Sequence, residues 1–160
     1  MLKVNELFDV KYGVNLELNA LQQTTDGINF VSRTAKNNGV SARVARLLDV
    51  DPIPAGTISV AGGGSVMESF LQTAPYYSGR DLYYLTSKVP LSDQEKLYYC
   101  ACLRANKYRY NYGRQANRTL RDIFIPSPDE IPKWVFETMS ELAEEMQSIL
   151  SGMFSVDSHA

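Results

Sequence analysis

The chain has 160 residues, of which 44% are hydrophobic and 21% charged, and its formal net charge is -2. A chain of this length can bury one good core, so we expect a single domain with an appended helix. The composition excludes a disordered or fibrous protein, and the slightly negative total argues against a protein that coats nucleic acid through bulk electrostatics.

The sequence also bears on where the protein works. Its uncharged stretches are far shorter than a membrane span, and residues 1–6 lack the apolar run of a signal peptide. Cys100 and Cys102 are separated by a single residue and could not easily bridge each other, which fits a reducing compartment. We therefore expect a cytoplasmic protein with no membrane partner.

Residues 1–30 carry a weak alternation of apolar side chains that ends at Gly13. The alternation predicts a short strand followed by a turn. Its members are Leu7, Phe8, Val10 and Tyr12.

Residues 29–48 are ambiguous between strand and helix. Alternation within Val40–Val44 suits a strand, whereas the spacing of Val44, Leu47 and Leu48 suits a helix. The Asn37–Gly39 segment is a strong turn signal, so we favour a strand and a loop.

Three short β-prone runs follow, at Thr57–Ala61, Ser65–Leu71 and Asp81–Leu85. Residues 62–64 are all glycine and break the first run from the second. Short β-prone runs separated by glycine turns predict a β-meander.

The period changes to that of a helix after residue 91. Ser92 and Glu95 have the spacing of a capping box, and the apolar positions that follow fit a helix from about Asp93 to Asn106. The chain then passes Gly113, which breaks the helix, and we expect a closing strand in "TLRDIFIPSP" that Pro126 ends.

A second helix is expected from near Pro132, followed by a short polar tail. Its apolar residues are spaced 4, 3, 4, 3 and 4, as in a coiled coil or helical bundle. They are Val135, Met139, Leu142, Met146, Ile149 and Met153. Either the helix docks on its own domain or it forms a seam with a second copy or a partner.

Catalytic chemistry finds little support in the sequence. The single histidine, His159, lies one residue from the C-terminus, so a serine or cysteine nucleophile has no base in the folded body. Cys100 and Cys102 lack the second ligand pair of a zinc site and are better interpreted as small buried hydrophobes. We expect no enzyme activity, no metal and no cofactor.

Two other motifs are also better explained by structure than by catalysis. The glycines of "AGGGS" at 61–65 are not followed by the Gly-Lys-Ser/Thr of a phosphate-binding loop, so a tight turn is the better interpretation. Asp93 and Glu95 near Lys96 could suggest a nuclease centre, but their place at a helix N-terminus explains them through capping and the helix dipole.

Charge is distributed very unevenly along the chain. Segments 27–48 and 104–121 contain four and six basic residues respectively and no acid, whereas 129–157 contains seven acids and only Lys133. A basic body and an acidic end indicate two surfaces with different partners.

The segment "RYNYGRQANR" at 109–118 has the chemistry of DNA recognition. Arginine matches guanine in the major groove, Asn and Gln can pair with adenine, and tyrosine supplies flat contact surface or phosphate hydrogen bonds. The segment "SRTAKNNGVSAR" at 32–43 offers a second basic, Asn-rich loop. The alternative, a solvated surface loop with inward-packing tyrosines, stays open with equal weight.

The order of several motifs resembles a known family. A glycine-rich turn in a strand pair, the "YYSGRD" segment at 76–81, a helix, the Tyr-Gly-Arg within 106–120 and a closing "IPSP" follow one another. This order resembles the target recognition domain of restriction-modification specificity subunits, the S subunits of type I systems and their relatives in fused nuclease-methyltransferase systems. The resemblance covers residues 5 to 128.

The resemblance implies an α/β domain of the α+β type that reads a few base pairs in the major groove. It also implies that a separate methyltransferase and nuclease supply the catalysis. In that family, long helices after each recognition domain pack together and dock the methyltransferase, and the stripe from Val135 to Met153 stands where such a helix begins. Family members usually carry two recognition domains, so we expect a half-subunit that dimerises, a truncated relic or a solitary module.

The predicted protein is therefore a non-catalytic specificity module with a recognition domain at 1–128 and a partner helix at 129–160. Its partners would be double-stranded DNA and a DNA methyltransferase or restriction subunit, with self-association through the helix. The alternative is an interaction module that binds a methyltransferase without reading DNA.

The expected DNA contacts fall into three groups by chemistry. The base readers would be Arg114, Gln115 and Asn117. The phosphate contacts would be Arg33, Lys36, Arg43, Lys107, Arg109 and Arg118. Tyr110 and Tyr112 would line the groove, and Asn38 is a further expected contact. Helix residues Val135, Met139, Leu142, Met146, Ile149 and Met153 would meet the partner.

Overall fold

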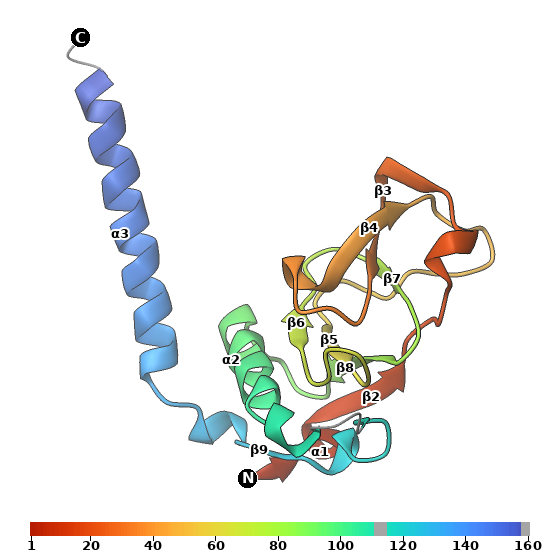
Figure 1. The fold of residues 1–160 in the computed structure, drawn as a ribbon. Coiled ribbons are helices and arrows are strands. Elements are labelled where there is room, and N and C mark those ends of the chain that lie inside the picture. Colours follow the sequence, from red (N-terminus) through yellow and green to blue (C-terminus); the bar gives the residue numbers. More distant parts are fainter. Residues whose placement is uncertain (111–114, 158–160) are drawn as a thin grey trace.

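The computed structural model of the chain describes residues 1–110 and 115–157, apart from the side chains of 138–140 and 154–157. It shows a body of short strands beside helix α2 (Asp93–Arg104) and a long helix, α3 (Trp134–Asp157), that extends away from this body (Figure 1). The prediction of an α/β domain of the α+β type is confirmed.

The larger sheet has four antiparallel strands in which β8 and β5 are central. Its order is β2 (Phe8–Tyr12), β8 (Leu82–Ser87), β5 (Ile58–Ala61), β6 (Ser69–Leu71). The predicted strand at the start of the chain is confirmed as β2, and two of the three later β-prone runs become β5 and β8. The third shortens to Ser69–Leu71, because residues 65–68 form the turn that reverses the chain after β5.

A second sheet of three strands disproves the predicted β-meander. Its order is β4 (Val40–Val44), β3 (Gln23–Val31), β7 (Tyr76–Ser78), with β7 parallel to β3. After β6 the chain therefore crosses to this sheet before it returns to the first sheet as β8. Burial of Tyr76 and Tyr77 drives the crossing, since each ring is at most 1% exposed.

The Asn37–Gly39 turn and the strand that follows it are confirmed. Asn37, Asn38 and Gly39 all have positive φ angles of 49°, 55° and 79°, the region that Asn and Gly tolerate best. Strand β3 was not predicted, because its first half is polar and its large apolar residues, Ile28, Phe30 and Val31, all lie in the last four positions.

The two ends of the body meet in a two-stranded sheet of β1 (Leu2–Lys3) and β9 (Phe124–Ile125). Only these last residues of the predicted closing strand are extended, because Leu120–Asp122 forms a 3-10 turn, η4, before it. The remaining short helices are α1 (Val4–Leu7), η1 (Leu18–Ala20), η2 (Asn37–Gly39), η3 (Lys107–Tyr110) and η5 (Pro128–Glu130).

Helix α2 begins as the sequence predicts. The Ser92 hydroxyl accepts a hydrogen bond from the Glu95 N–H at 3.2 Å, and the Glu95 carboxylate accepts one from the Ser92 N–H at 3.0 Å. This capping box satisfies two backbone donors of the first turn. Tyr99, Cys100 and Leu103 on the inner face are buried in the main core, so the helix covers the larger sheet.

The main core also takes in the start of the C-terminal segment. Ile131 and Val135 are 7% and 6% exposed and pack with the core under α2, and the Trp134 ring lies edge-on to Tyr98 at 6.4 Å. Val135, expected on the partner seam, therefore has its partner within the chain. Its position on the first turn of α3, against α2, accounts for its burial.

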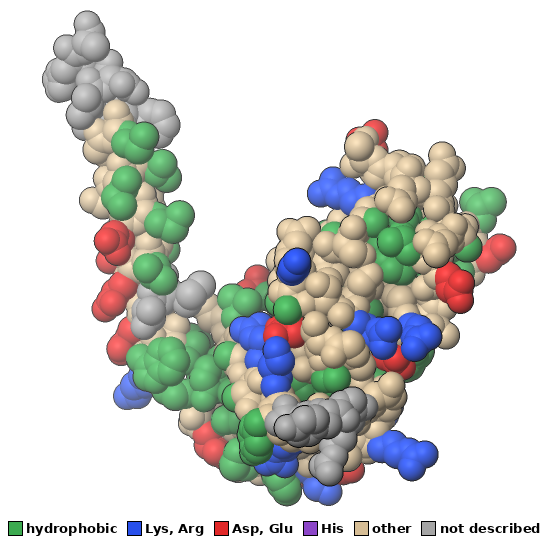
Figure 2. Space-filling view, viewed as in Figure 1, with side chains coloured by type: hydrophobic (Ala, Val, Ile, Leu, Met, Phe, Trp, Pro, Cys, Tyr) green, Lys and Arg blue, Asp and Glu red, His purple; other side chains and the backbone are tan. Residues whose placement is uncertain are grey.

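Beyond Val135, the described side chains of the seam are exposed. Leu142, Met146, Ile149 and Met153 are 49%, 64%, 58% and 62% exposed, and we call these four residues the apolar stripe. Figure 2 shows hydrophobic side chains along one side of the helix and acidic ones on another. Met139 lies within α3, but its side chain is outside the described part of the chain.

Candidate nucleic-acid interface

Two segments that the sequence marks for DNA binding meet at the glycine turn, Gly62–Gly64. The Gly62 carbonyl accepts a hydrogen bond from the Ala116 N–H at 2.9 Å. On the other side, the Arg33 carbonyl accepts one from the Ser65 N–H at 3.4 Å. The turn therefore joins the basic segment after β3 to the one after α2.

Gly62 is the residue that permits this close approach. A Cβ atom there would lie 2.5 Å from the Asn117 Oδ1 and 2.9 Å from the Tyr83 ring, distances that real Cβ contacts do not reach. Ala116 and Leu120 beside it are fully buried. The glycines of "AGGGS" therefore form a packed turn, as the sequence predicts, and the residues after 114 dock on it.

Asn117 faces the body of the protein. Its Nδ2 donates to the Gln115 Oε1 at 2.6 Å, while its Oδ1 is buried and has no hydrogen-bond partner within the described residues. A buried acceptor in this state costs about 1–3 kcal/mol, so close packing at Gly62 must hold it in place. Gln115 and Arg118, by contrast, are exposed and can reach a ligand.

The segment from Lys107 to Tyr110 is largely committed to contacts within the chain. Lys107 forms an ion pair with Glu68, and the Tyr110 hydroxyl lies 2.7 Å from the Thr119 Oγ1. The Arg109 guanidinium lies over its neighbour Tyr108, 5.5 Å from the ring centroid, and stays exposed. Tyr112 and Arg114 lie outside the described residues, so the roles predicted for them stay predictions.

The second basic segment, residues 32–43, also contains both exposed side chains and side chains that already contact the rest of the chain. Lys36 is exposed without an ion pair among the described residues, and Arg43 on β4 is exposed and donates to the Thr25 carbonyl at 3.3 Å. The Asn38 side chain donates to the Leu71 carbonyl at 3.0 Å and its carbonyl accepts from Gln72 at 2.9 Å. Asn38 therefore fastens the turn to β6, and its side chain is already occupied.

Arg33 is an ion-paired residue. Its Nη1 lies 2.9 Å from the Asp81 Oδ2, and its side chain is 29% exposed. Its Cβ also packs where Gly64 leaves room, since a Cβ on Gly64 would lie 2.9 Å from it. A phosphate contact by Arg33 would have to compete with the carboxylate of Asp81.

One cationic residue near this face was missed by the sequence reasoning. The Arg121 guanidinium lies 5.8 Å from the centroid of the Tyr83 ring, and its Nη2 donates to the Val10 carbonyl at 3.1 Å. Tyr12 stacks edge-on against the same Tyr83 ring at 5.2 Å. Burial raises the pKa of Tyr83. The sequence signal was present, since Arg121 closes the acid-free segment, but its neighbours come from distant strands.

Basic side chains form several separate groups on the face of the body shown in Figure 2, and acidic side chains lie next to some of them. This arrangement gives local positive patches in a chain whose net charge is negative.

The two cysteines and the acidic side chains bear on catalytic and metal chemistry. Burial raises the pKa of the Cys100 thiol to about 12 and also raises that of Cys102, so neither is a thiolate at neutral pH. No group of three or more His, Cys, Asp or Glu residues that could hold a metal occurs within the described residues. In the same residues, no helix is long and apolar enough to cross a membrane.

Comparison with known proteins places the fold. No protein-family model matches the chain, and no curated protein is a match by sequence. The fold itself is found in solved structures of type I restriction-modification specificity subunits. The resemblance predicted from the sequence is therefore confirmed for the fold.

Three solved structures illustrate the likeness. The HsdS subunit from Thermoanaerobacter tengcongensis superposes with a TM-score of 0.64 at 15% identity over 94% of this chain and 38% of its own. A chain from a study of assembly and conformational transition of the type I R-M system superposes with a TM-score of 0.64 at 16% identity, over 95% of this chain and 39% of its own. The type I S subunit of M. genitalium superposes with a TM-score of 0.61 at 21% identity, over 94% of this chain and 40% of its own.

The extent of these matches is informative. The chain spans about two fifths of the length of each neighbour. A coverage of 94% leaves about ten residues unmatched, fewer than the 24 residues of α3, so the match extends into that helix. The likeness therefore concerns a body together with the beginning of a helix that leaves it.

Proposed function

We propose that this protein is a non-catalytic, sequence-specific DNA-recognition module of a restriction-modification system that works in the cytoplasm. The observation that supports the proposal best is the likeness of fold to S subunits over nearly the whole chain. Catalysis would come from a methyltransferase or nuclease that the module directs to its site.

DNA recognition is assigned to the body within residues 1–128. Two basic, acid-free segments dock on one glycine turn there, and Gln115, Arg118, Lys36 and Arg43 are exposed for contact. Arg114 and Tyr112 complete the proposed set from the sequence alone. Cationic side chains would hold the phosphates, and amide and guanidinium groups would read base edges.

Selection of duplexes from a randomised pool at low salt tests this proposal. An enriched motif of a few base pairs, whose affinity falls steeply with salt when the winners are re-titrated, is the expected result. Binding without enrichment would reduce the role to holding the DNA backbone. A folded protein that binds no duplex at all would overturn the proposal.

Helix α3 supports a second function, which the proposal includes and which could also stand alone. The apolar stripe is exposed over three turns, and α3 contains acids but no lysine or arginine. We propose that residues 129–160 contact a methyltransferase subunit or a second copy of this chain through the stripe. Burial of such a stripe against another helix would remove its apolar surface from water, which lowers the free energy of the complex.

A matched pair of variants tests the helix. Leu142→Asp with Met146→Asp places two charges on the stripe, whereas Gln147→Asp with Ser151→Asp places the same charges on the polar side of α3. Only the stripe variant should lose the partner in a pull-down with the methyltransferase, or lose the dimer in sedimentation. If both variants retain the partner and the dimer, α3 is not the contact.

These variants also separate the two functions. Because the stripe lies away from the basic segments, the stripe variant should keep the affinity of one body for one half-site. A loss of DNA binding in both helix variants would point to a general effect on folding, which circular dichroism would reveal.

A further inference from the structure

The turn Gly79–Asp81 before β8 is a motif that the proposed function leaves unused. Asp81 has a φ angle of 53°, in the left-handed region that non-glycine residues seldom adopt. Its N–H donates to the Tyr12 hydroxyl at 2.7 Å, and its carbonyl accepts from the Gly62 N–H at 2.7 Å. Contacts from β2 and the glycine turn thus hold Asp81 in a conformation that costs free energy by itself.

The carboxylate of Asp81 lies between two guanidinium groups. Its Oδ2 is 2.9 Å from the Arg33 Nη1 and 3.7 Å from the Arg80 Nε. The side chains of Asp81 and Arg33 are 18% and 29% exposed, whereas that of Arg80 is 73% exposed. One carboxylate cannot neutralise two arginines, so the group keeps one positive charge, and Arg80 presents it.

Arg80 has an unoccupied hydrogen-bonding edge. Its Nε side faces Asp81, while its two Nη groups make no hydrogen bond or ion pair within residues 1–110 and 115–157. The ion pair at 3.7 Å is longer than a hydrogen bond, but it favours the orientation in which Nε faces Asp81 and the Nη edge faces away from it. A planar pair of N–H donors matches two oxygens of a phosphate.

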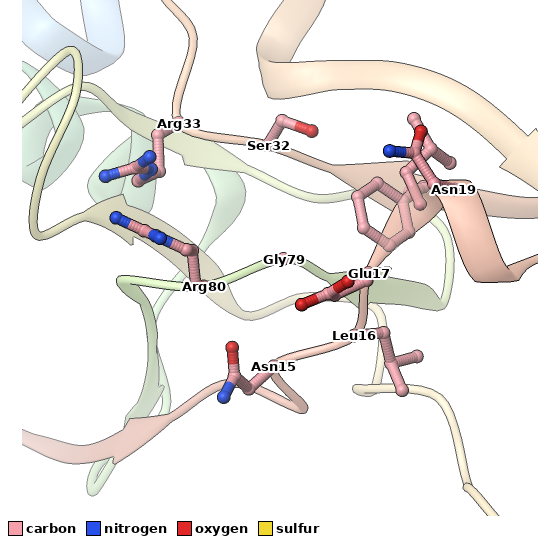
Figure 3. Close-up of a pocket in the computed structure, with 10 residues that line it drawn as sticks. Asn15, Leu16, Glu17, Asn19, Ser32, Arg33, Gly79 and Arg80 are labelled. Atoms are coloured by element: carbon pink, nitrogen blue, oxygen red, sulfur yellow. The ribbon is translucent and has the colours of Figure 1, made fainter.

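Arg80 and Arg33 lie next to each other at one side of an open cleft, and Glu17 lies across from them (Figure 3). The cleft has a volume of about 480 Å³ and also contains Asn15, Asn19 and Ser32. Glu17 has no ion pair in the described part of the chain and would repel an anion that entered deeply. An anion should therefore bind at the arginine side of the cleft.

We propose that Arg80 contacts a phosphate of the DNA backbone and that Asp81 is the residue that positions it. This inference rests on the proposed function and adds to it a contact that the acid-free segments did not include. Arg33 then serves mainly to fix Asp81. The phosphate contact gives register to the body on the duplex and carries no base preference.

The test is the salt dependence of binding to a labelled random-sequence duplex. Arg80→Ala should weaken binding about tenfold at low salt, as expected for one charge-assisted hydrogen-bonded contact, and should reduce the salt slope by about one unit. Arg80→Lys keeps the charge but loses the fork, so it should keep the slope and lose part of the affinity.

Arg46→Ala is the matched control. Arg46 is an exposed arginine at 3.7 Å from an exposed carboxylate, Asp51, and it does not line the cleft. Arg46→Ala removes the same charge outside the cleft, so if the contact of Arg80 is local it should change binding much less than Arg80→Ala. Equal effects of the two variants would mean that only total charge matters, and the inference would be wrong.

Asp81→Asn separates positioning from electrostatics. Asparagine tolerates the positive φ of residue 81, and the substitution makes the protein more positive by one charge. If Asp81 only repelled DNA, Asp81→Asn would bind more tightly. If it positions Arg80, binding should weaken severalfold despite the added charge, and the variant should respond less to Arg80→Ala than the wild type does.

Glu17→Gln completes the set. Removal of the carboxylate should strengthen binding modestly and equally for all duplexes in the selected pool. A relaxed preference at one base position would instead make the cleft a base-reading site and would contradict the phosphate assignment. Failure of the wild type to bind DNA would defeat the proposed function, whereas unchanged binding and salt slope in Arg80→Ala would defeat this inference alone.

Discussion

The glycine turn and the apolar stripe of α3 are both singled out by the sequence, but they are built in opposite ways. At the turn, Tyr83 of β8 and Asn117 of the segment after 114 crowd onto Gly62, and the neighbouring Ala116 and Leu120 are fully buried. Along the stripe, four large apolar side chains are about half exposed or more. The DNA binding proposed at the turn would depend on a conformation that the chain enforces, whereas the partner binding proposed at the stripe would depend on surface that the described part of the chain leaves uncovered.

The largest expected contrast comes from one substitution made in both regions. Leu120→Ala removes a buried side chain of the main core and should lower the free energy of unfolding by about 2–5 kcal/mol. Leu142→Ala removes a half-exposed one and should change it by less than about 0.5 kcal/mol. Urea denaturation at low protein concentration measures both values. Similar losses would show that the stripe is packed within the chain.

Glycine substitutions sharpen the contrast at the turn. Gly62→Ala should destabilise the protein by about 1–3 kcal/mol, because the added methyl overlaps Asn117 and Tyr83, and should weaken DNA binding by displacing the docked segment. Asn117→Ala in the same chain removes one of the two clashes. The double variant should therefore be more stable than the sum of the single changes predicts, and additivity would show that the two residues do not interact.

Substitution of Gly152 in α3 should have a small local effect of opposite sign, because it stabilises the helix. Apart from its chain neighbours and the backbone of its own helix, a Cβ there would meet no described atom within 4 Å, and alanine favours a helix over glycine by about 1 kcal/mol. Gly152→Ala should therefore slow amide hydrogen exchange in the last turns of α3 and leave exchange in α2 unchanged. Faster exchange in α3 would mean that this position needs glycine for another reason.

Elements with local signals were predictable from the sequence. The capping box of Ser92 and Glu95 begins α2 wherever the rest of the chain lies, and the positive φ angles at 37–39 follow from Asn-Asn-Gly alone. Strand β7 was not predictable in its pairing, because Tyr76–Ser78 could join either sheet and only the tertiary burial of its tyrosines decides between them.

The candidate site shows the same division. Sequence chemistry found the two basic segments, but it could not tell that Asn117 packs inward, that Asn38 fastens a turn or that Val135 joins the core. It also missed Arg80, because only the folded chain brings Arg33 to the carboxylate of the adjacent Asp81 and so leaves Arg80 with the uncompensated charge. Residue types determine charge and hydrogen-bonding capacity. Contacts between distant strands determine which of these groups can still reach a ligand.

The pairing of β1 with β9 has a consequence for how such a body can be carried in longer chains. Leu2 lies opposite Ile125 and Lys3 opposite Phe124, so the polypeptide enters and leaves the body at one place. A unit whose entry and exit adjoin can be inserted between two helices, or exchanged for another unit, with little strain on what flanks it. Another body exchanged at the β1–β9 pair would therefore keep the path of the flanking chain, and it would keep the geometry of α3 if its core also accepted Ile131 and Val135.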